Sequence, residues 1–158
     1  MKAENWQQAV PTPCVGVCST GIGDTVCRGC KRYAHEVIHW NGYTDEQKQR
    51  VMERLDRLLT QIVSAKLDLF DTARLRARLE DQRIRYSRHR APAMWITELL
   101  KAGASQIQTT EDWGFARQPH CADWSLEALR DAIDREFHLL SEAHYERYIL
   151  VRAPHLHA

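Results

Sequence analysis

Residues 14–30 read CVGVCSTGIGDTVCRGC, and this stretch contains four of the five cysteines of the chain. The cysteines form two close pairs, Cys14 with Cys18 and Cys27 with Cys30, and eight residues separate the pairs. Two such pairs suit a tetrahedral metal site, because each pair can cover one side of the ion while the intervening loop brings the pairs together. We therefore predict that these four cysteines bind a metal.

The segment that carries the cysteines is short and rich in glycine. About 30 residues cannot bury enough apolar surface to fold unaided, and a bound metal contributes folding energy directly. A short helix is expected directly after Cys30, where its N-terminus would favour the thiolate form that ligates metal. We therefore predict a four-cysteine metal-binding module over residues 1–43 and a helical region over residues 44–158.

The helical region begins with a clear start signal. Thr44-Asp45-Glu46-Gln47 matches the capping box, in which residues 44 and 47 bond each other's backbone NH groups. Apolar residues then recur at helical spacing. The pattern predicts either one very long helix over residues 45–88 or two helices with a break near residues 64–72. The first part of the expected buried stripe is Val51, Met52, Leu55, Leu58, Leu59, Ile62 and Val63, and Phe70, Ala73, Ala77 and Ile84 roughly continue it.

Two further helices are expected. Pro92 and Gly103 frame a short helix over residues 93–102, since proline favours the first helical position and glycine follows helix ends. Residues 103–124 form an irregular segment that bears tryptophans, and Ser125 caps a last helix over residues 126–150. The predicted fold class is mainly α: a small loop-rich four-cysteine metal knuckle followed by a helical bundle or a long helical hairpin.

Residues 13–58 resemble a known bacterial family. The shared features are Pro13-Cys14, Cys18, Cys27-Arg28-Gly29-Cys30, Glu36, Trp40 and the helix after Thr44. The family is the domain of unknown function family numbered 1289, whose members are labelled predicted iron–sulfur proteins. This sequence departs from the family pattern at Lys31-Arg32-Tyr33, where a Gly-Arg-Thr run is more usual. The resemblance implies a cysteine-ligated metal centre and supplies no activity.

The identity of the metal stays open at this point. The resemblance favours an iron–sulfur cluster, whereas a glycine-containing turn ahead of a helix fits a structural zinc site at least as well. Thiolate ligands suit both, because four cysteines hold tetrahedral Zn²⁺ as well as iron–sulfur clusters.

A second pattern lies close to the cysteines. Residues 35–39 read HEVIH, which matches the His-Glu-x-x-His pattern of zinc proteases. No third ligand stands out downstream, so we expect these histidines to lie at the surface or to contact the metal ligands without binding the metal. We predict that His35, His39 and Trp40 surround the metal or that a histidine ligates it. The remaining cysteine, Cys121, is expected to be a partly buried thiol.

Arginines are frequent between residues 74 and 90. On a continuous helix, Arg74, Arg78, Arg85 and Arg88 would form one stripe, and such a stripe could contact the phosphates of RNA or DNA. The competing interpretation is a solvated helix whose charges flank its apolar seam.

Composition limits the remaining possibilities. The chain has 158 residues with 22 Lys and Arg against 21 Asp and Glu, so no global field attracts nucleic acid or an acidic membrane. No apolar run is long enough to cross a bilayer, and the start of the chain lacks the apolar core of a secretory signal. We expect a cytoplasmic protein.

Three functions remain open. The first is a metal-binding accessory or regulatory protein that acts through macromolecular contacts, with another protein as the expected partner. The second is a nucleic-acid-binding protein that uses the arginines, and the third is a redox carrier or redox enzyme with a four-cysteine cluster. No complete catalytic arrangement was found, so an enzyme is not expected, and the apolar seams leave a dimer possible.

Overall fold

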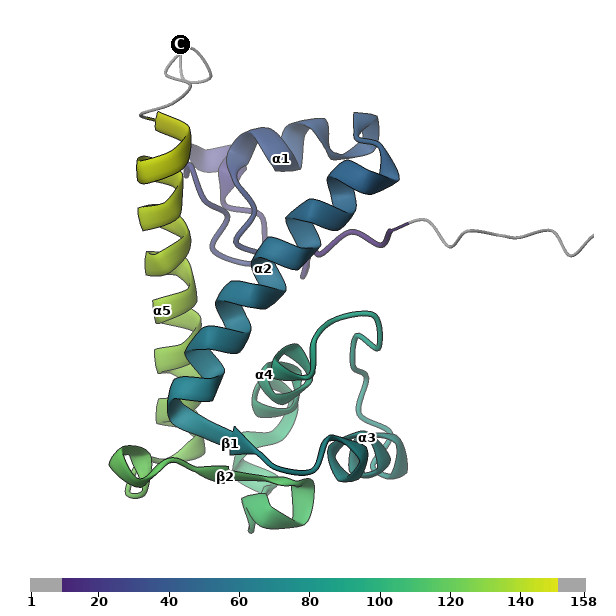
Figure 1. Cartoon of the computed structure of the whole chain (residues 1–158), viewed down its shortest axis with the longest axis vertical. Helices are drawn as coiled ribbons and strands as arrows, with labels where there is room; N and C mark the ends of the chain where they lie inside the picture. The colour runs from purple at the N-terminus through teal and green to yellow at the C-terminus, as the bar shows by residue number, and fades with distance from the viewer. Residues whose placement is uncertain (1–9, 151–158) are drawn as a thin grey trace, which may run out of the picture.

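The computed structural model describes residues 10–150 of the chain. This part is mainly α-helical, as predicted, and contains short 3₁₀ turns and a two-stranded sheet (Figure 1). The helices are α1 (Ala34–His39), α2 (Asp45–Lys66), α3 (Thr72–Asp81), α4 (Pro92–Gly103) and α5 (Leu126–Tyr145), and the strands are β1 (Leu67–Leu69) and β2 (Phe115–Arg117). The short turns are η1 (Thr20–Ile22), η2 (Trp40–Gly42), η3 (Ala104–Gln106), η4 (Thr110–Trp113), η5 (Pro119–Cys121) and the π-helical η6 (Glu146–Leu150).

The start of α2 has the predicted capping box. The Thr44 hydroxyl accepts a hydrogen bond from the backbone NH of Gln47 at 3.1 Å, and the Gln47 side chain accepts from the backbone NH of Thr44 at 2.9 Å. All seven residues of the first part of the stripe, from Val51 to Val63, are buried. The helix therefore begins where its sequence indicates and turns its apolar face to the core.

The long helical pattern is broken at the predicted place. Helix α2 ends at Lys66, and residues 67–69 form β1, which pairs antiparallel with β2 in the register Leu67 to Arg117. The sheet was not predicted, because its partner strand lies about 50 residues further along the chain. The continuation of the buried stripe is wrong for the same reason: Phe70 is 50% exposed, and α3 buries Leu75 and Leu79 instead.

The later helices agree with the sequence to within a few residues. Helix α4 begins at Pro92 and ends at Gly103. The Ser125 hydroxyl accepts from the backbone NH of Ala128 at 3.0 Å and so caps α5, which ends at Tyr145 before the π-helical turn rather than running on to residue 150. None of the described helices is both long and apolar enough to cross a membrane.

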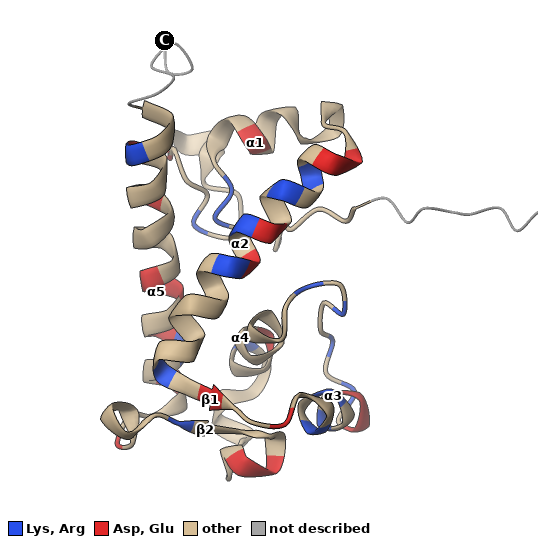
Figure 2. Ribbon diagram, in the orientation of Figure 1, with Lys and Arg blue, Asp and Glu red and all other residues tan. Residues whose placement is uncertain are grey.

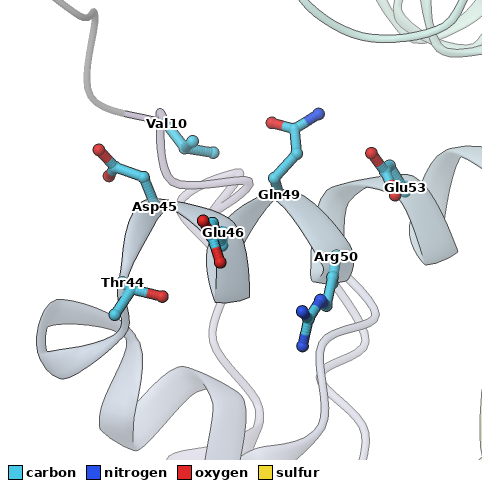
Figure 3. Close-up of a pocket in the computed structure, with 7 residues that line it drawn as sticks. All are labelled: Val10, Thr44, Asp45, Glu46, Gln49, Arg50 and Glu53. Atoms are coloured by element: carbon cyan, nitrogen blue, oxygen red, sulfur yellow. The ribbon is translucent and has the colours of Figure 1, made fainter.

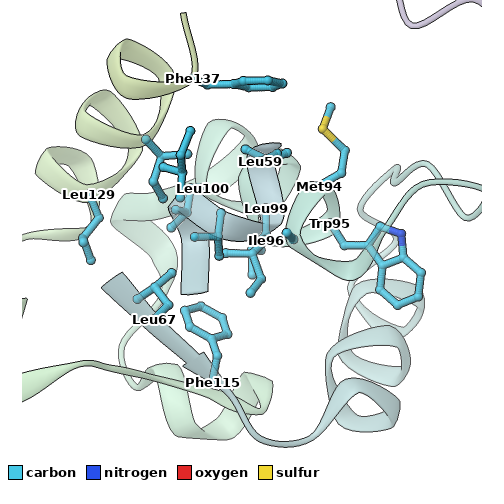
Figure 4. Packing of buried hydrophobic residues seen from close by; sticks show 14 of the residues in the cluster. Leu59, Leu67, Met94, Trp95, Ile96, Leu99, Leu100, Phe115, Leu129 and Phe137 are labelled. Carbon is cyan, nitrogen blue, oxygen red and sulfur yellow. The ribbon is translucent and has the colours of Figure 1, made fainter. Parts of the chain in front are cut away.

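One large apolar core joins these elements. Helix α2 packs against both α4 and α5, and the β1–β2 sheet closes the end of the arrangement (Figure 1). Figure 4 shows α4 residues such as Ile96 and Leu100 meeting Leu59, Leu67, Phe115 and Leu129 from its neighbours. Trp40, which follows the cysteine-bearing segment, belongs to the same core and packs that segment against the helical region.

Candidate metal centre

The second cysteine pair lies in a tight reversal of the chain. Val26 and Tyr33 form an antiparallel bridge, and inside it the backbone NH of Cys27 donates to the Arg32 carbonyl at 2.9 Å. The backbone NH of Lys31 donates to the Cys27 carbonyl, also at 2.9 Å, and Lys31 has a left-handed φ of 66°. This turn places both thiols inside the protein, with Cys27 only 1% and Cys30 only 7% exposed.

The first pair lies in an exposed loop. Gly16 has a φ of 88°, and its backbone NH donates to the Cys14 sulfur at 3.4 Å. The Cys18 sulfur lies 3.1 Å from the Thr20 hydroxyl. Both thiols of this pair face solvent, so the two pairs differ sharply in their surroundings.

The two cysteine turns pack directly against each other. The Cys27 thiol donates to the carbonyl of Val17 at 3.4 Å, and the backbone NH of Arg28 donates to the Ser19 hydroxyl at 2.8 Å. A Cβ atom placed on Gly29 would lie 2.4 Å from the Val17 carbonyl oxygen, so only glycine permits this approach. The loop of the first pair therefore contacts the turn of the second pair through Val17 and Ser19.

The four sulfurs are nevertheless not gathered around one point. Within residues 10–150, no group of three or more His, Cys, Asp or Glu side chains is arranged to hold a metal ion. The geometry of a closed four-cysteine knuckle therefore stays a prediction.

The two buried thiols have different proton affinities. Burial raises the pKa of Cys27, but hydrogen bonds from the backbone of Cys30, Ser19 and Gly29 outweigh it and lower the pKa from 9.0 to about 7. Burial dominates at Cys30 and raises its pKa above 9.0, although the Arg32 side chain acts in the opposite direction. Cys27 therefore loses its proton at a lower pH than Cys30 does.

Two residues of this turn, Lys31 and Arg32, have buried cationic side chains. Arg32 is only 4% exposed, its Nε donates to the Cys30 sulfur at 3.3 Å, and its guanidinium lies 4.8 Å from the centre of the Trp40 ring. Lys31 is 1% exposed, and its ammonium donates to the carbonyl of Arg28 and to the Asp134 carboxylate of α5 at 2.8 Å. Lys31 thereby ties the cysteine turn to α5.

Glu36 has a structural role. Its carboxylate receives two hydrogen bonds from the Arg54 guanidinium, at 2.6 and 2.7 Å, and a third from the backbone NH of Tyr33 at 2.9 Å. The Arg54 guanidinium also lies 4.0 Å from the centre of the Tyr33 ring. This partly buried ion pair joins α1 to α2.

The histidine pattern does not form a protease site in this structure. Glu36 is bound by Arg54 and is not a free base, and His39 is exposed. The ring of His35 lies 5.8 Å from that of Tyr33. Trp40 does reach the surroundings of the cysteines, because Arg32 connects its ring to the Cys30 sulfur.

The predicted stripe of arginines is not continuous. Arg74 and Arg78 lie on α3, where Arg74 pairs with Asp71 at 3.5 Å and Arg78 lies 4.9 Å from the centre of the Trp113 ring. Arg85 and Arg88 follow the end of α3 at Asp81, so they do not continue its face. The remaining thiol, Cys121, is fully buried in the main core rather than partly buried as expected.

A large surface hollow lies away from these groups. It has a volume of about 870 Å³, follows the first turns of α2 and is lined by Val10, Thr44, Asp45, Glu46, Gln49, Arg50 and Glu53 (Figure 3). Its described lining contains neither cysteine nor histidine and is open to solvent, so it adds no ligand to the candidate centre.

The match to a family model falls on the same part of the molecule. Residues 12–59, which comprise the two cysteine turns, α1 and most of α2, match the model of the family described as "Protein of unknown function (DUF1289)". The resemblance predicted for residues 13–58 is therefore confirmed over this segment. Searches among curated proteins and among solved structures each found no match.

The residues that support the centre were only partly found from sequence. The sequence singles out the cysteines and Trp40 as site residues, whereas it gives Lys31, Arg32 and Arg54 no role in the site. The run Lys31-Arg32 directly after the second pair was visible, but its burial was not. Charged residues are almost never fully buried unless they are paired, so the sequence favoured solvent for both.

Proposed function

We propose that Cys14, Cys18, Cys27 and Cys30 together hold one metal ion, and that the protein is a metal-binding accessory or regulatory protein. The observation that carries the proposal is the environment of Arg32. Its buried guanidinium forms no ion pair with a carboxylate of residues 10–150, and its polar partner is the Cys30 sulfur. A buried cation is expensive without a compensating anion.

Metal binding would provide that anion by converting the Cys30 thiol into a thiolate. Without metal, burial raises the pKa of Cys30 and so favours the neutral thiol beside Arg32. A bound metal displaces the proton and holds Cys30 as a thiolate. Four thiolates around a divalent ion carry a net charge of about −2, which Arg32 would offset.

Two features of the second pair suit metal binding by its sulfurs. Cys27 and Cys30 lie in one tight turn, and both thiols are buried there. Sulfurs around a tetrahedral zinc lie about 3.8 Å apart when each Zn–S bond is about 2.3 Å, and one ion can therefore bridge a close pair. In addition, the backbone NH groups that lower the Cys27 pKa would stabilise its thiolate. We propose Zn²⁺, with the iron–sulfur cluster implied by the resemblance as the alternative.

The exposed pair would complete the site. Cys14 and Cys18 must turn toward Cys27 and Cys30, and their loop already contacts the second turn through Val17. When bound, the metal would contribute folding energy to a segment that has few apolar contacts of its own.

A macromolecular partner is supported by the surface of the same loop. Val15, Val17 and Ile22 are 46%, 61% and 83% exposed, although large apolar residues near a site favour burial. A metal that orders this loop would present the three side chains together. We propose that another protein binds there, which would give the metal an accessory or regulatory role rather than a catalytic one.

Metal analysis with matched variants tests the proposal. Protein purified without oxygen should contain one zinc per chain and lack visible absorption. Cys27→Ser and Cys30→Ser should lose the zinc, whereas Cys121→Ser, which changes a thiol of the main core, should retain it. Iron with matching sulfide and a broad visible band would establish the cluster and make the redox alternative the leading one. Protein that contains neither metal would refute the proposal.

A further inference from the structure

Three arginines converge on one hollow beyond the end of α3. The hollow has a volume of about 440 Å³, and its lining consists of Glu80, Arg83, Ile84, Arg85, Tyr86 and Arg88. The three arginines are exposed. Figure 2 shows Lys and Arg positions along the segment that follows α3, between that helix and α4. The arrangement is a row of cations on a connecting segment, unlike the helical stripe expected from the sequence.

The first of these arginines occupies an unfavourable backbone conformation. Helix α3 ends in a Schellman motif, in which Ile84 NH donates to the Leu79 carbonyl at 2.9 Å and Arg83 NH donates to that of Glu80 at 3.1 Å. Arg83 has the left-handed φ of 56° that this motif requires. Glycine is the usual residue there, because a side chain is disfavoured in that conformation. An arginine at this position therefore adds charge at the expense of backbone strain.

Few carboxylates neutralise the row. Glu80 pairs with Arg88 at 3.2 Å and also accepts a hydrogen bond from the Tyr86 hydroxyl at 2.6 Å. Arg83 and Arg85 form no ion pair with any carboxylate in the described part of the chain. The hollow therefore carries three guanidinium groups against one carboxylate.

The neighbouring groups hold the row in place. Tyr86 meets the Trp95 ring edge-on, with the ring centres 5.2 Å apart, and the Trp95 indole NH donates to the Ser87 carbonyl at 2.8 Å. The segment ends at Arg90, whose guanidinium is buried against Asp56 of α2 at 2.5 Å. The segment is thus anchored at both ends of the row, while Arg83, Arg85 and Arg88 remain exposed.

We propose that this hollow binds the phosphate backbone of single-stranded nucleic acid. Arginine donates to phosphate through its planar fork of NH groups, and three exposed guanidinium groups around one hollow suit a chain of several phosphates. Tyr86 is occupied by Trp95, so the contacts are to the backbone and carry no preference for base sequence. This proposal is independent of the metal proposed for the cysteine module.

Binding of a labelled single-stranded RNA to the full chain tests the proposal. The probe is a fluorescein-labelled 20-nucleotide oligouridine, and the readout is fluorescence anisotropy. For three phosphate contacts, affinity should fall about 20-fold between 50 and 200 mM KCl, since the logarithmic slope for single strands is about 0.7 per phosphate. The same strand as DNA should bind with similar affinity.

Two sets of variants separate the hollow from general charge. The combined variant Arg83→Gln, Arg85→Gln and Arg88→Gln should lose at least tenfold in affinity at 50 mM KCl. The control Arg50→Gln, Arg57→Gln and Arg135→Gln changes net charge equally at exposed helical sites and should bind within about twofold of the wild type.

A single substitution provides an independent check on folding. Arg83→Gly should raise the melting temperature, because glycine adopts a positive φ readily, yet it should weaken RNA binding. Absence of salt-sensitive binding at 50 mM KCl would overturn the proposal. Equal losses in the two triple variants, or equally tight binding of polyglutamate, would also overturn it.

Discussion

Substitution of Gly29 probes the contact between the two cysteine turns. A Cβ atom at this position would lie 2.4 Å from the Val17 carbonyl oxygen and 2.9 Å from Cγ2 of Val15. Ordinary contacts begin near 3.4 Å, so the turns must separate by about 1 Å to admit a methyl group. Overpacking of this kind costs about 1–3 kcal/mol, and we take about 2 kcal/mol for Gly29→Ala.

This cost should appear in the affinity for zinc, because the proposed metal site requires the two turns to be in contact. A loss of about 2 kcal/mol corresponds to about a 30-fold weaker zinc affinity. Competition with a chromophoric chelator measures it. Gly21→Ala is the matched control, since a Cβ there meets nothing within 4 Å, and its affinity should equal that of the wild type. If Gly29→Ala binds zinc as tightly as Gly21→Ala, the two turns do not form one site.

Three further predictions concern single groups. Glu36→Gln should lower the free energy of unfolding, measured in urea, by about 3 kcal/mol, because it leaves the Arg54 guanidinium without its charged partner. The control Glu53→Gln, on the exposed face of α2, should change it by under about 0.5 kcal/mol. Equal effects of the two substitutions would refute the structural role of Glu36. In metal-free protein, the thiolate absorbance near 240 nm should show a step at about pH 7, and Cys27→Ser should remove it. The free energy of unfolding should rise from pH 7 to 9, because the Cys27 thiol has a pKa of about 7 in the folded state and of 9.0 in the unfolded state. The folded state therefore binds fewer protons than the unfolded state over this range. A titration without that step would contradict the backbone hydrogen bonds described for Cys27. Ser125→Ala should cost about 1 kcal/mol in thermal unfolding, since it removes the acceptor at the start of α5, and an unchanged melting temperature would show that the cap contributes nothing.

The elements that could be predicted are those with local signals. The Thr44 capping box, Pro92 at the first position of α4 and the Ser125 cap each act within a few residues of themselves, and each helix begins where expected. The two cysteine pairs can likewise be recognised from the sequence, because the members of each pair lie within four residues of each other.

The features that were missed depend on distant partners. Strand β1 forms because Leu67–Leu69 can pair with Phe115–Arg117, and nothing in its own residues distinguishes it from a continuing helix. The end of α3 carries Arg83 where glycine would have marked it, so the arginine stripe was extended too far.

The surroundings of the cysteines show the same limit. The burial of Lys31 follows from Asp134, which lies 103 residues away on α5, and a single sequence does not reveal such a pairing. The contact of Arg32 with Cys30 is close in sequence, but it becomes meaningful only because both side chains are buried. The sequence thus named the candidate ligands, and the structure adds the cations that would balance their charge.

X-ray absorption at the metal edge of protein purified without oxygen tests the central claim most directly. We predict a zinc edge with four sulfur neighbours at about 2.3 Å and no second metal nearby. An iron edge with iron–iron scattering, or a zinc site with nitrogen or oxygen in place of the cysteine sulfurs, would contradict the proposal of one ion held by Cys14, Cys18, Cys27 and Cys30.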